Sequence, residues 1–150
     1  MPHDSRSPAD REDDAASRYL TLGVKVAGVR CLVVGAGAVG LHKALTLARH
    51  CAKVVVCDPM MSGSLREMVD AKQVIWQACR YHPGLLRGMR LVVAATSDAT
   101  LNLEISQQAE GRGIPCCLTS DSSASRVLFP AIHDQDGLRI AVHSHGRSPG

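Results

Sequence analysis

The stretch Cys31-Leu32-Val33-Val34-Gly35-Ala36-Gly37-Ala38-Val39-Gly40 decides how this chain folds. Its apolar first half is typical of a buried strand, and residues Val39 to Arg49 have the apolar spacing of a helix. Between them, three glycines follow the pattern G-x-G-x-x-G. Gly35 would allow the turn off the strand, Gly37 would let a pyrophosphate approach the backbone, and Gly40 would let the helix pack closely on the strand. The sequence therefore predicts a dinucleotide site at the start of the helix.

A second strand and an acidic residue follow at the distance that such a site needs. Lys53 to Cys57 is β-branched and apolar, and Asp58 ends it. An acid about 20 residues after the glycines, at the tip of the second strand, is where ribose hydroxyls are held. The alternative is a glycine turn followed by an ordinary loop aspartate. Strand, glycines, helix, strand and acid occur in the expected order, which favours the nucleotide site.

Length and composition indicate one folded domain with an aliphatic core. The chain has 150 residues, of which only 3% are aromatic. Residues 1–18 are polar and rich in acids, which predicts a disordered leader, and residues 19–150 are expected to form the nucleotide-binding domain. No apolar run approaches the roughly 18 residues of a membrane span, and no signal-peptide pattern opens the chain. We therefore expect a cytoplasmic protein that does not bind a membrane.

Charge and cysteine usage narrow the function classes. The net charge of +3 suits an anionic cofactor or a polycarboxylate substrate. The basic residues are dispersed and lack an aromatic stacking platform, which argues against a nucleic-acid partner. None of the six cysteines forms a C-x-x-C pair, and we interpret Cys31, Cys57 and Cys79, which lie in or beside apolar runs, as small buried hydrophobes in a reducing compartment. A metal or redox role for these thiols is the alternative.

Strands and helices alternate along the chain, which predicts an α/β fold. The expected strands are Val29–Val34, Lys53–Cys57, Val74–Cys79, Leu91–Ala95 and Ile114–Leu118. The expected helices are Val39–Arg49, a short helix capped by Ser64 and running through Met68, a single turn at Leu85-Leu86, and Thr100–Arg112. Such alternation is typical of a Rossmann-type, doubly wound parallel sheet with helices on both faces. Two further strands, Val127–Ile132 and Leu138–Val142, are expected to form a C-terminal β-hairpin around a turn at His133–Gly137.

The loops that follow the parallel strands should meet at one edge of the sheet. Ligands of such sheets bind beyond the carboxyl ends of the strands. The four loops placed there are Gly35–Gly40, Asp58–Met60, Thr96–Asp98 and Thr119–Ser125. A ligand that spans this edge would touch all four.

Several stretches, taken in order, resemble one family. They are Val33–Gly40 with Lys43-Ala44, Arg80-Tyr81, Ala94–Asp98 with Asn102, Phe129–Ile132, Ile140–Val142 and Gly146–Pro149. The chain resembles, from about Leu20 to Pro149, the precorrin-2 dehydrogenase and sirohydrochlorin ferrochelatase family, the N-terminal module of siroheme synthases. The glycine stretch is common to dinucleotide binders, whereas the later stretches are much more specific.

The resemblance implies an enzyme of siroheme biosynthesis, a branch of porphyrin biosynthesis. It would be an oxidoreductase that converts precorrin-2, a tetrapyrrole, to sirohydrochlorin with NAD as hydride acceptor, and some members also insert ferrous iron. Carried over by position, the cofactor contacts are Ala38 and Val39 for the pyrophosphate, Asp58, Pro59 and Met60 for the adenosine ribose, and Thr96 and Ser97 for the nicotinamide end.

The chain departs from the family at the place of the expected proton-handling acid. The family has an aspartate after the fifth strand, and its place falls on Ser120, with Asp121 one residue later. A serine cannot replace a carboxylate as a base without further activation. Two interpretations remain open: Asp121 is the catalytic surrogate, or it is a turn aspartate. Cys117 also stands where the family has asparagine.

The resemblance also bears on substrate contacts and assembly. Ser120 is a candidate for contacting the tetrapyrrole, and Ser144 for contacting either the tetrapyrrole or the cofactor. Arg126 and Arg147 are candidate carboxylate partners because their loops should face the site, and solvated loop arginines are the alternative. The family continues past the position of Gly150 into helices that dimerise the protein. These 150 residues contain no counterpart of that helical domain, and three interpretations stay open: a fragment, a separate chain that supplies the helices, or loss of the reaction. A homodimer is an expectation from the family alone.

The histidines near the end of the chain give no firm metal signal. His143 and His145 would share one face of a strand, with His133 near them across the hairpin. No fixed ligand spacing supports a metal, so solvated histidines are the favoured interpretation.

Two other functions compete with the dehydrogenase. One is a non-catalytic NAD-binding module that keeps the nucleotide site and has lost the acid. The other is a nucleotide-sensing regulatory domain of the potassium-transport type, which shares the glycine stretch. The matches from Phe129 to Pro149 argue against the second.

Overall fold

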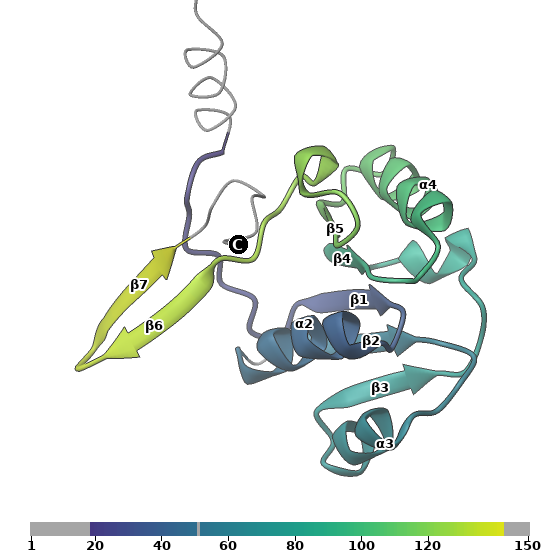
Figure 1. The fold of residues 1–150 in the computed structure, drawn as a ribbon, viewed down its shortest axis with the longest axis horizontal. Coiled ribbons are helices and arrows are strands. Elements are labelled where there is room, and N and C mark those ends of the chain that lie inside the picture. Colours follow the sequence, from purple (N-terminus) through teal and green to yellow (C-terminus); the bar gives the residue numbers. More distant parts are fainter. Residues whose placement is uncertain (1–18, 51, 143–150) are drawn as a thin grey trace, which may run out of the picture.

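The computed structural model describes residues 19–50 and 52–142, and its centre is a five-stranded parallel sheet (Figure 1). The strands are β1 (Arg30–Val34), β2 (Lys53–Cys57), β3 (Val74–Gln77), β4 (Leu91–Ala94) and β5 (Cys116–Leu118). Their order is β3-β2-β1-β4-β5, and all neighbours run parallel. In the sheet, β2 and β3 lie on one side of β1, and β4 and β5 lie on the other. The predicted Rossmann-type, doubly wound sheet is therefore confirmed, with its switch point between β1 and β4.

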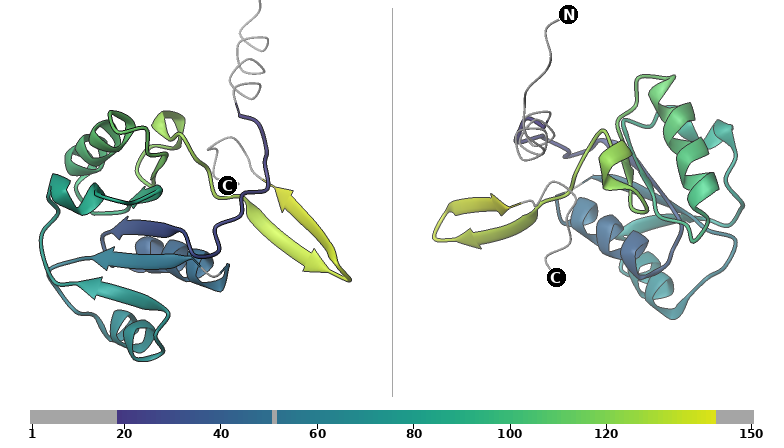
Figure 2. Two further views of the ribbon diagram at one scale, coloured as in Figure 1. Left: turned by 180° about the vertical axis from the view of Figure 1, so that it is seen from behind. Right: turned by 45° about the horizontal axis from the view of Figure 1, so that its top comes forward.

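Helices cover both faces of the sheet because successive strand residues point to opposite sides. The helical segments are α2 (Ala38–Arg49), α3 (Gly63–Asp70), the 3₁₀ turn η1 (Pro83–Leu86) and α4 (Ala99–Glu110). Cys31 and Val33 belong to the core packed under α2 and α3, whereas Leu32 and Val34 belong to the core with η1 and α4. Figure 2 shows these two helical layers from further directions. Four of the five residues of β1 are buried, as expected for a central parallel strand.

The start of one helix differs from the sequence prediction. Ser62, not Ser64, is the N-cap of α3, since its Oγ accepts a hydrogen bond from the Leu65 amide at 3.2 Å. Ser64 already lies within the helix. The helix begins earlier because the serine two positions upstream has the extended backbone that a cap requires.

The predicted strand over 127–132 is also wrong in its first half. The hairpin consists of β6 (Ala131–Gln135) and β7 (Leu138–Val142), and residues 127–130 are not in a strand. Phe129 instead packs against the core, where the Lys43 Nζ lies 4.9 Å from the ring centroid. The turn is shorter than the predicted His133–Gly137, because strand pairing continues to Gln135 and the two-residue turn is Asp136-Gly137.

The hairpin stands apart from the parallel sheet (Figures 1 and 2). Every residue of β6 and β7 is exposed. Leu138, Ile140 and Val142 alternate along β7 and so share one face, with 64%, 47% and 64% of their surface exposed. This face is apolar and has no partner among the residues that the structure describes.

Several expectations lie outside the described residues. They concern the leader at 1–18, Cys51, and the segment 143–150 with His143, Ser144, His145 and Arg147. The single domain over 19–150 therefore stays a prediction. Within the part of the chain that is described, no helix is both long and apolar enough to cross a membrane.

Candidate nucleotide site

A cavity of about 640 Å³ lies at the carboxyl ends of the strands. It is lined by residues that follow four strands: Val34–Gly37 after β1, Cys57–Pro59 after β2, Cys79–Tyr81 after β3, and Ala95–Asp98 with Leu101 after β4. Its volume is that of an ordinary small-molecule site. Of the sequence-predicted residues, the structure brings Gly35, Gly37, Asp58, Pro59, Thr96 and Ser97 together in this lining.

Two of the glycines permit close backbone approaches, Gly35 to the segment that follows β4 and Gly40 to the turn between β1 and α2. Gly35 has a φ of +99°, and a Cβ there would lie 2.5 Å from the Ala95 carbonyl oxygen. A Cβ on Gly40 would lie 2.0 Å from the Gly35 carbonyl oxygen. Neither position can take a side chain without moving backbone. The predicted roles of Gly35 in the turn and Gly40 in helix packing agree with this geometry.

The third glycine borders open space. In the described part of the chain, no atom lies within 4 Å of the place where a Cβ on Gly37 would stand. Gly37 is the N-cap of α2 and supplies no side-chain hydrogen bond. The amides of Ala38, Val39 and Gly40 therefore find no acceptor among the described residues. An open approach with unpaired amides at a helix N-terminus fits a pyrophosphate.

Asp58 is fixed by three hydrogen bonds at the tip of β2. Its Oδ2 accepts from the Ala36 amide and its Oδ1 from the Met60 amide, each at 2.8 Å. The Trp76 indole N–H donates to the Asp58 carbonyl oxygen at 2.8 Å. A carboxylate offers about four acceptor positions, so both oxygens keep capacity for ribose hydroxyls. Met60 is largely exposed beside this carboxylate and outside the cavity lining.

A buried amide links the loops that follow β4 and β5. The Asn102 side chain is fully buried, and its Oδ1 accepts from both the amide and the hydroxyl of Thr96 at 3.0 and 2.7 Å. Its Nδ2 donates to the Thr96 carbonyl at 3.0 Å and to the Ser120 hydroxyl at 3.3 Å. Thr96 and Ser120 are therefore held side by side at the same edge of the sheet.

Asp121 serves as a cap in the described structure. It precedes the 3₁₀ turn η2 (Ser122–Ala124), and its Oδ1 accepts from the amide and hydroxyl of Ser123 at 2.9 and 2.6 Å. The hydrogen bond from the Ser123 hydroxyl is the main cause that lowers the pKa of Asp121. The carboxyl is exposed and lies outside the cavity lining, and its Oδ2 has no partner among the described residues.

Arg126, predicted as a substrate contact, points elsewhere. Its guanidinium forms an ion pair with Glu110 at the end of α4. Its amide donates to the Cys116 carbonyl at 2.9 Å, which aligns the loop along β5. The structure does not bring Arg126 to the cavity, because the last turn of α4 offers a carboxylate within reach.

Cys57, which lines the cavity, is held as a neutral thiol. Cys57 Sγ lies 3.9 Å from Cys79 Sγ and donates to the Cys79 carbonyl at 3.2 Å. Burial is the main cause that raises the pKa of Cys57 to about 12, and burial likewise raises the pKa of Cys31 and Cys116 to about 11. Such thiols are poor nucleophiles at neutral pH. Within the described part of the chain, no group of three potential ligands could hold a metal ion.

Comparison with known proteins agrees with this geometry. Residues 22–131 match the model of a family described as "Putative NAD(P)-binding". The chain belongs to this NAD(P)-binding family. The chain is 39% identical over 131 residues to a siroheme synthase of Chromobacterium violaceum and 36% identical over 132 residues to that of Ectopseudomonas mendocina. These matches cover 87% and 88% of this chain but 28% of each relative, so the chain spans little more than a quarter of their length.

Solved structures agree on the fold. A precorrin-2 dehydrogenase, SirC, superposes with a TM-score of 0.73 at 20% identity, over 87% of this chain and 64% of that one. The apo D-lactate dehydrogenase of Escherichia coli superposes with a TM-score of 0.50 at 17% identity, over 65% of this chain and 30% of that one. At these identities the likeness concerns the fold.

Sequence reasoning assigned no role to several residues that the structure puts in the site. Cys79, Arg80 and Tyr81 line the cavity, and Asn102 supports it from beneath. The signal for Asn102 was available, since it is a polar residue beside the apolar face of a helix. Arg80 and Tyr81 follow a short strand whose end the sequence pattern placed at Cys79 rather than Gln77.

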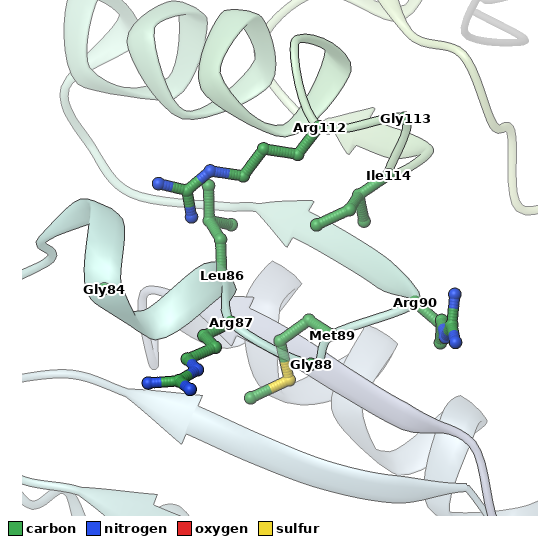
Figure 3. Close-up of a pocket in the computed structure, with 9 residues that line it drawn as sticks. All are labelled: Gly84, Leu86, Arg87, Gly88, Met89, Arg90, Arg112, Gly113 and Ile114. Carbon is green, nitrogen blue, oxygen red and sulfur yellow. The ribbon is translucent and has the colours of Figure 1, made fainter.

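A second cavity of about 590 Å³ lies at the opposite, amino-end edge of the sheet (Figure 3). Its lining includes Arg87, Arg90 and Arg112 around apolar Leu86 and Met89. Figure 3 shows the Arg90 side chain pointing away from the other two. Arg112 is engaged with the Pro83 carbonyl, to which it donates at 2.6 Å. The three guanidinium groups therefore do not converge on one ligand position, and this cavity is separate from the nucleotide site.

Proposed function

We propose that this chain catalyses the NAD-dependent oxidation of precorrin-2 to sirohydrochlorin in siroheme biosynthesis. The observation that carries the proposal is the open glycine loop at the uncapped start of α2 beside the fixed Asp58 carboxylate. The family membership and the 39% identity to a siroheme synthase support the substrate class. NAD, when it is bound, would accept the hydride from the substrate.

The adenosine half of the cofactor would lie on the β1–β2 side of the cavity. The first-turn amides of α2, including those of Ala38 and Val39, would bind the pyrophosphate. Asp58 would accept the ribose hydroxyls, with Pro59 and Met60 beside it. The same negative charge would repel the 2′-phosphate of NADP, which favours NAD as the cofactor.

The nicotinamide half would lie on the β4–β5 side, near Thr96 and Ser97. Oxidation of the substrate releases a hydride to the cofactor and a proton to an acceptor. Asp121 is the proposed acceptor through its Oδ2, which the cap leaves free among the described residues. Its lowered pKa keeps it ionised at neutral pH and makes it a weak base.

Assembly and location form part of the same proposal. The exposed apolar face of β7, formed by Leu138, Ile140 and Val142, supports a homodimer in which a second copy covers it. Sedimentation should then show a dimer, and Ile140→Arg should give monomers; a monomeric wild type would contradict this. The free cysteines of the described residues, Cys31, Cys57, Cys79, Cys116 and Cys117, support a reducing, cytoplasmic location.

NADH formation from enzymatically generated precorrin-2 tests the reaction. We expect turnover by the 150-residue chain and a loss of at least about 100-fold in kcat for Asp121→Ala. Asp70→Ala, at the exposed end of α3, is the matched control. NAD binding without turnover would overturn the dehydrogenase and leave a non-catalytic NAD-binding module. Turnover that Asp121→Ala leaves unchanged would instead remove Asp121 from the mechanism.

A further inference from the structure

Asn102 is a buried polar residue whose hydrogen bonds are all used. Its Oδ1 accepts two bonds from Thr96, and its Nδ2 donates one to the Thr96 carbonyl and one to Ser120 Oγ. An amide nitrogen has two protons and no acceptor capacity, so the orientation of this side chain is fixed. If the side-chain amide were reversed, its NH₂ group would face the Thr96 amide N–H and its oxygen would face the Thr96 carbonyl oxygen. The direction of the bond to Ser120 is therefore fixed as well.

The consequence falls on the Ser120 hydroxyl. Because Ser120 Oγ accepts from Asn102, its single proton remains to be donated elsewhere. Ser120 is exposed, and its hydroxyl donates to no other described residue. The protein thus presents one oriented hydrogen-bond donor at the carboxyl end of β5.

The position of this donor indicates its acceptor. Ser120 follows β5 and is tied to Thr96, which follows β4, whereas Asp58 lies on the other side of the switch point. A dinucleotide that crosses this edge, with its adenosine at Asp58, places its other half beside β4 and β5. We infer that the Ser120 hydroxyl, oriented by Asn102, donates a hydrogen bond to the carboxamide oxygen of the bound nicotinamide. This inference rests on the proposed function.

The inference gives the serine a role different from that of an acid. A carboxylate at this position would only accept hydrogen bonds and would repel a carboxamide oxygen. A hydroxyl that accepts from Asn102 still has its proton to donate, which a carboxylate lacks. Asn102 is then a positioning residue, since it acts on the cofactor through Ser120 and through the Thr96 loop.

The variant Ser120→Ala tests the contact with the nicotinamide half of NAD separately from the contacts with the adenosine half. We expect its Kd for NAD to rise about fivefold, as for the loss of one neutral hydrogen bond, while its Kd for ADP-ribose stays unchanged. ADP-ribose lacks the nicotinamide but keeps every group that meets Asp58 and α2. Quenching of the fluorescence of Trp76, the single tryptophan, can report both affinities, since its indole contacts Asp58. Ser64→Ala, on the first turn of α3, is the matched control.

Asn102→Asp tests the orienting role. Its carboxylate would accept from Ser120 and turn the hydroxyl proton inward, so we expect the same fivefold loss for NAD at high pH. Protonation of this buried carboxyl at lower pH supplies a donor again, and we expect the NAD affinity to recover. The double variant with Ser120→Ala should lose no more than either single variant. Gln107→Glu, at an exposed position on the same helix, is the control, with thermal melts to confirm folding.

The outcomes are distinguishable. A fivefold loss for NAD alone supports the inference. An unchanged Kd for NAD, or an equal loss for ADP-ribose, overturns it while the proposed nucleotide site stands. If Asn102→Asp does not fold, Ser120→Ala decides alone. A wild-type chain that binds neither ligand overturns the proposed function, and the inference with it.

Discussion

The helices α2 and α4 start in equivalent places, but the backbone amides of their first turns are capped differently. Each follows one of the two strands that flank the switch point, β1 and β4. The N-cap of α4 is Asp98, whose Oδ1 accepts from the amides of Thr100 and Leu101 at 2.9 and 3.1 Å. The N-cap of α2 is Gly37, which offers no side chain. One helix start is completed by the protein, and the other is left for a ligand to complete.

The difference shows how a repeated unit acquires a binding site. Both helices have the same positive N-terminal end of the backbone dipole. At α4 the carboxylate of Asp98 neutralises it, and Asn102 then ties the next turn to Thr96. At α2 no atom of the described residues lies within 4 Å of the place where a Cβ on Gly37 would stand. Variants at the two starts should therefore separate stability from ligand affinity.

Gly40→Ala should give the largest effect, and on stability. Its Cβ would stand 2.0 Å from the Gly35 carbonyl oxygen, so β1 and α2 must move apart. We expect a loss of about 3 kcal/mol in the free energy of unfolding, measured by urea denaturation. Gly63→Ala in α3 is the control, because no atom lies within 4 Å of its added Cβ. Equal midpoints for the two variants would contradict the close approach.

Gly37→Val should act on the ligand instead. The side chain enters open space, so we expect a change in unfolding free energy of no more than about 1 kcal/mol. It would block the path of the pyrophosphate to the first-turn amides, and we expect NAD affinity to fall at least about 100-fold. Titration calorimetry with NAD measures this. Retained affinity would show that the phosphates bind elsewhere.

Local patterns predicted the α2 half of the site from sequence. The turn at Gly35, the packing of Gly40 and the place of Asp58 each follow from spacing within one β-α-β unit. The β2 bounds agree with the prediction, since a β-branched run admits little else. The fold class followed from the alternation of such units.

The other half depends on contacts between residues far apart in sequence. The bond from Asn102 to Ser120 joins α4 to the loop after β5, 18 positions along the chain, and no local spacing specifies it. The pairing of Arg126 with Glu110 likewise depends on where α4 ends. The segment before Pro130 has the composition of a strand but pairs with no strand among the described residues. Tertiary context decided these features.

Asp58→Asn should have an intermediate effect. The amide would keep one acceptor for the Ala36 or Met60 amide and lose the other, together with the charge that meets the ribose. We expect NAD affinity to fall about tenfold and the preference for NAD over NADP to shrink, since the repulsion of a 2′-phosphate is removed. Paired titrations with the two cofactors measure this. Asp70→Asn on α3 controls for net charge, and an unchanged preference would exclude Asp58 from the ribose.

Asp98→Ala should have the smallest effect and should complete the contrast with α2. The amides of Thr100 and Leu101 would lose their acceptor, so we expect a loss of about 1 kcal/mol in unfolding free energy. Asp98→Ser keeps a capping oxygen and should recover most of it. The carboxylate is already committed to the helix, so NAD affinity should stay within about twofold of the wild type. A large change in NAD affinity would mean that the start of α4 also binds the ligand. The contrast between α4, capped by Asp98, and α2, whose first-turn amides are left for the ligand, would then be wrong.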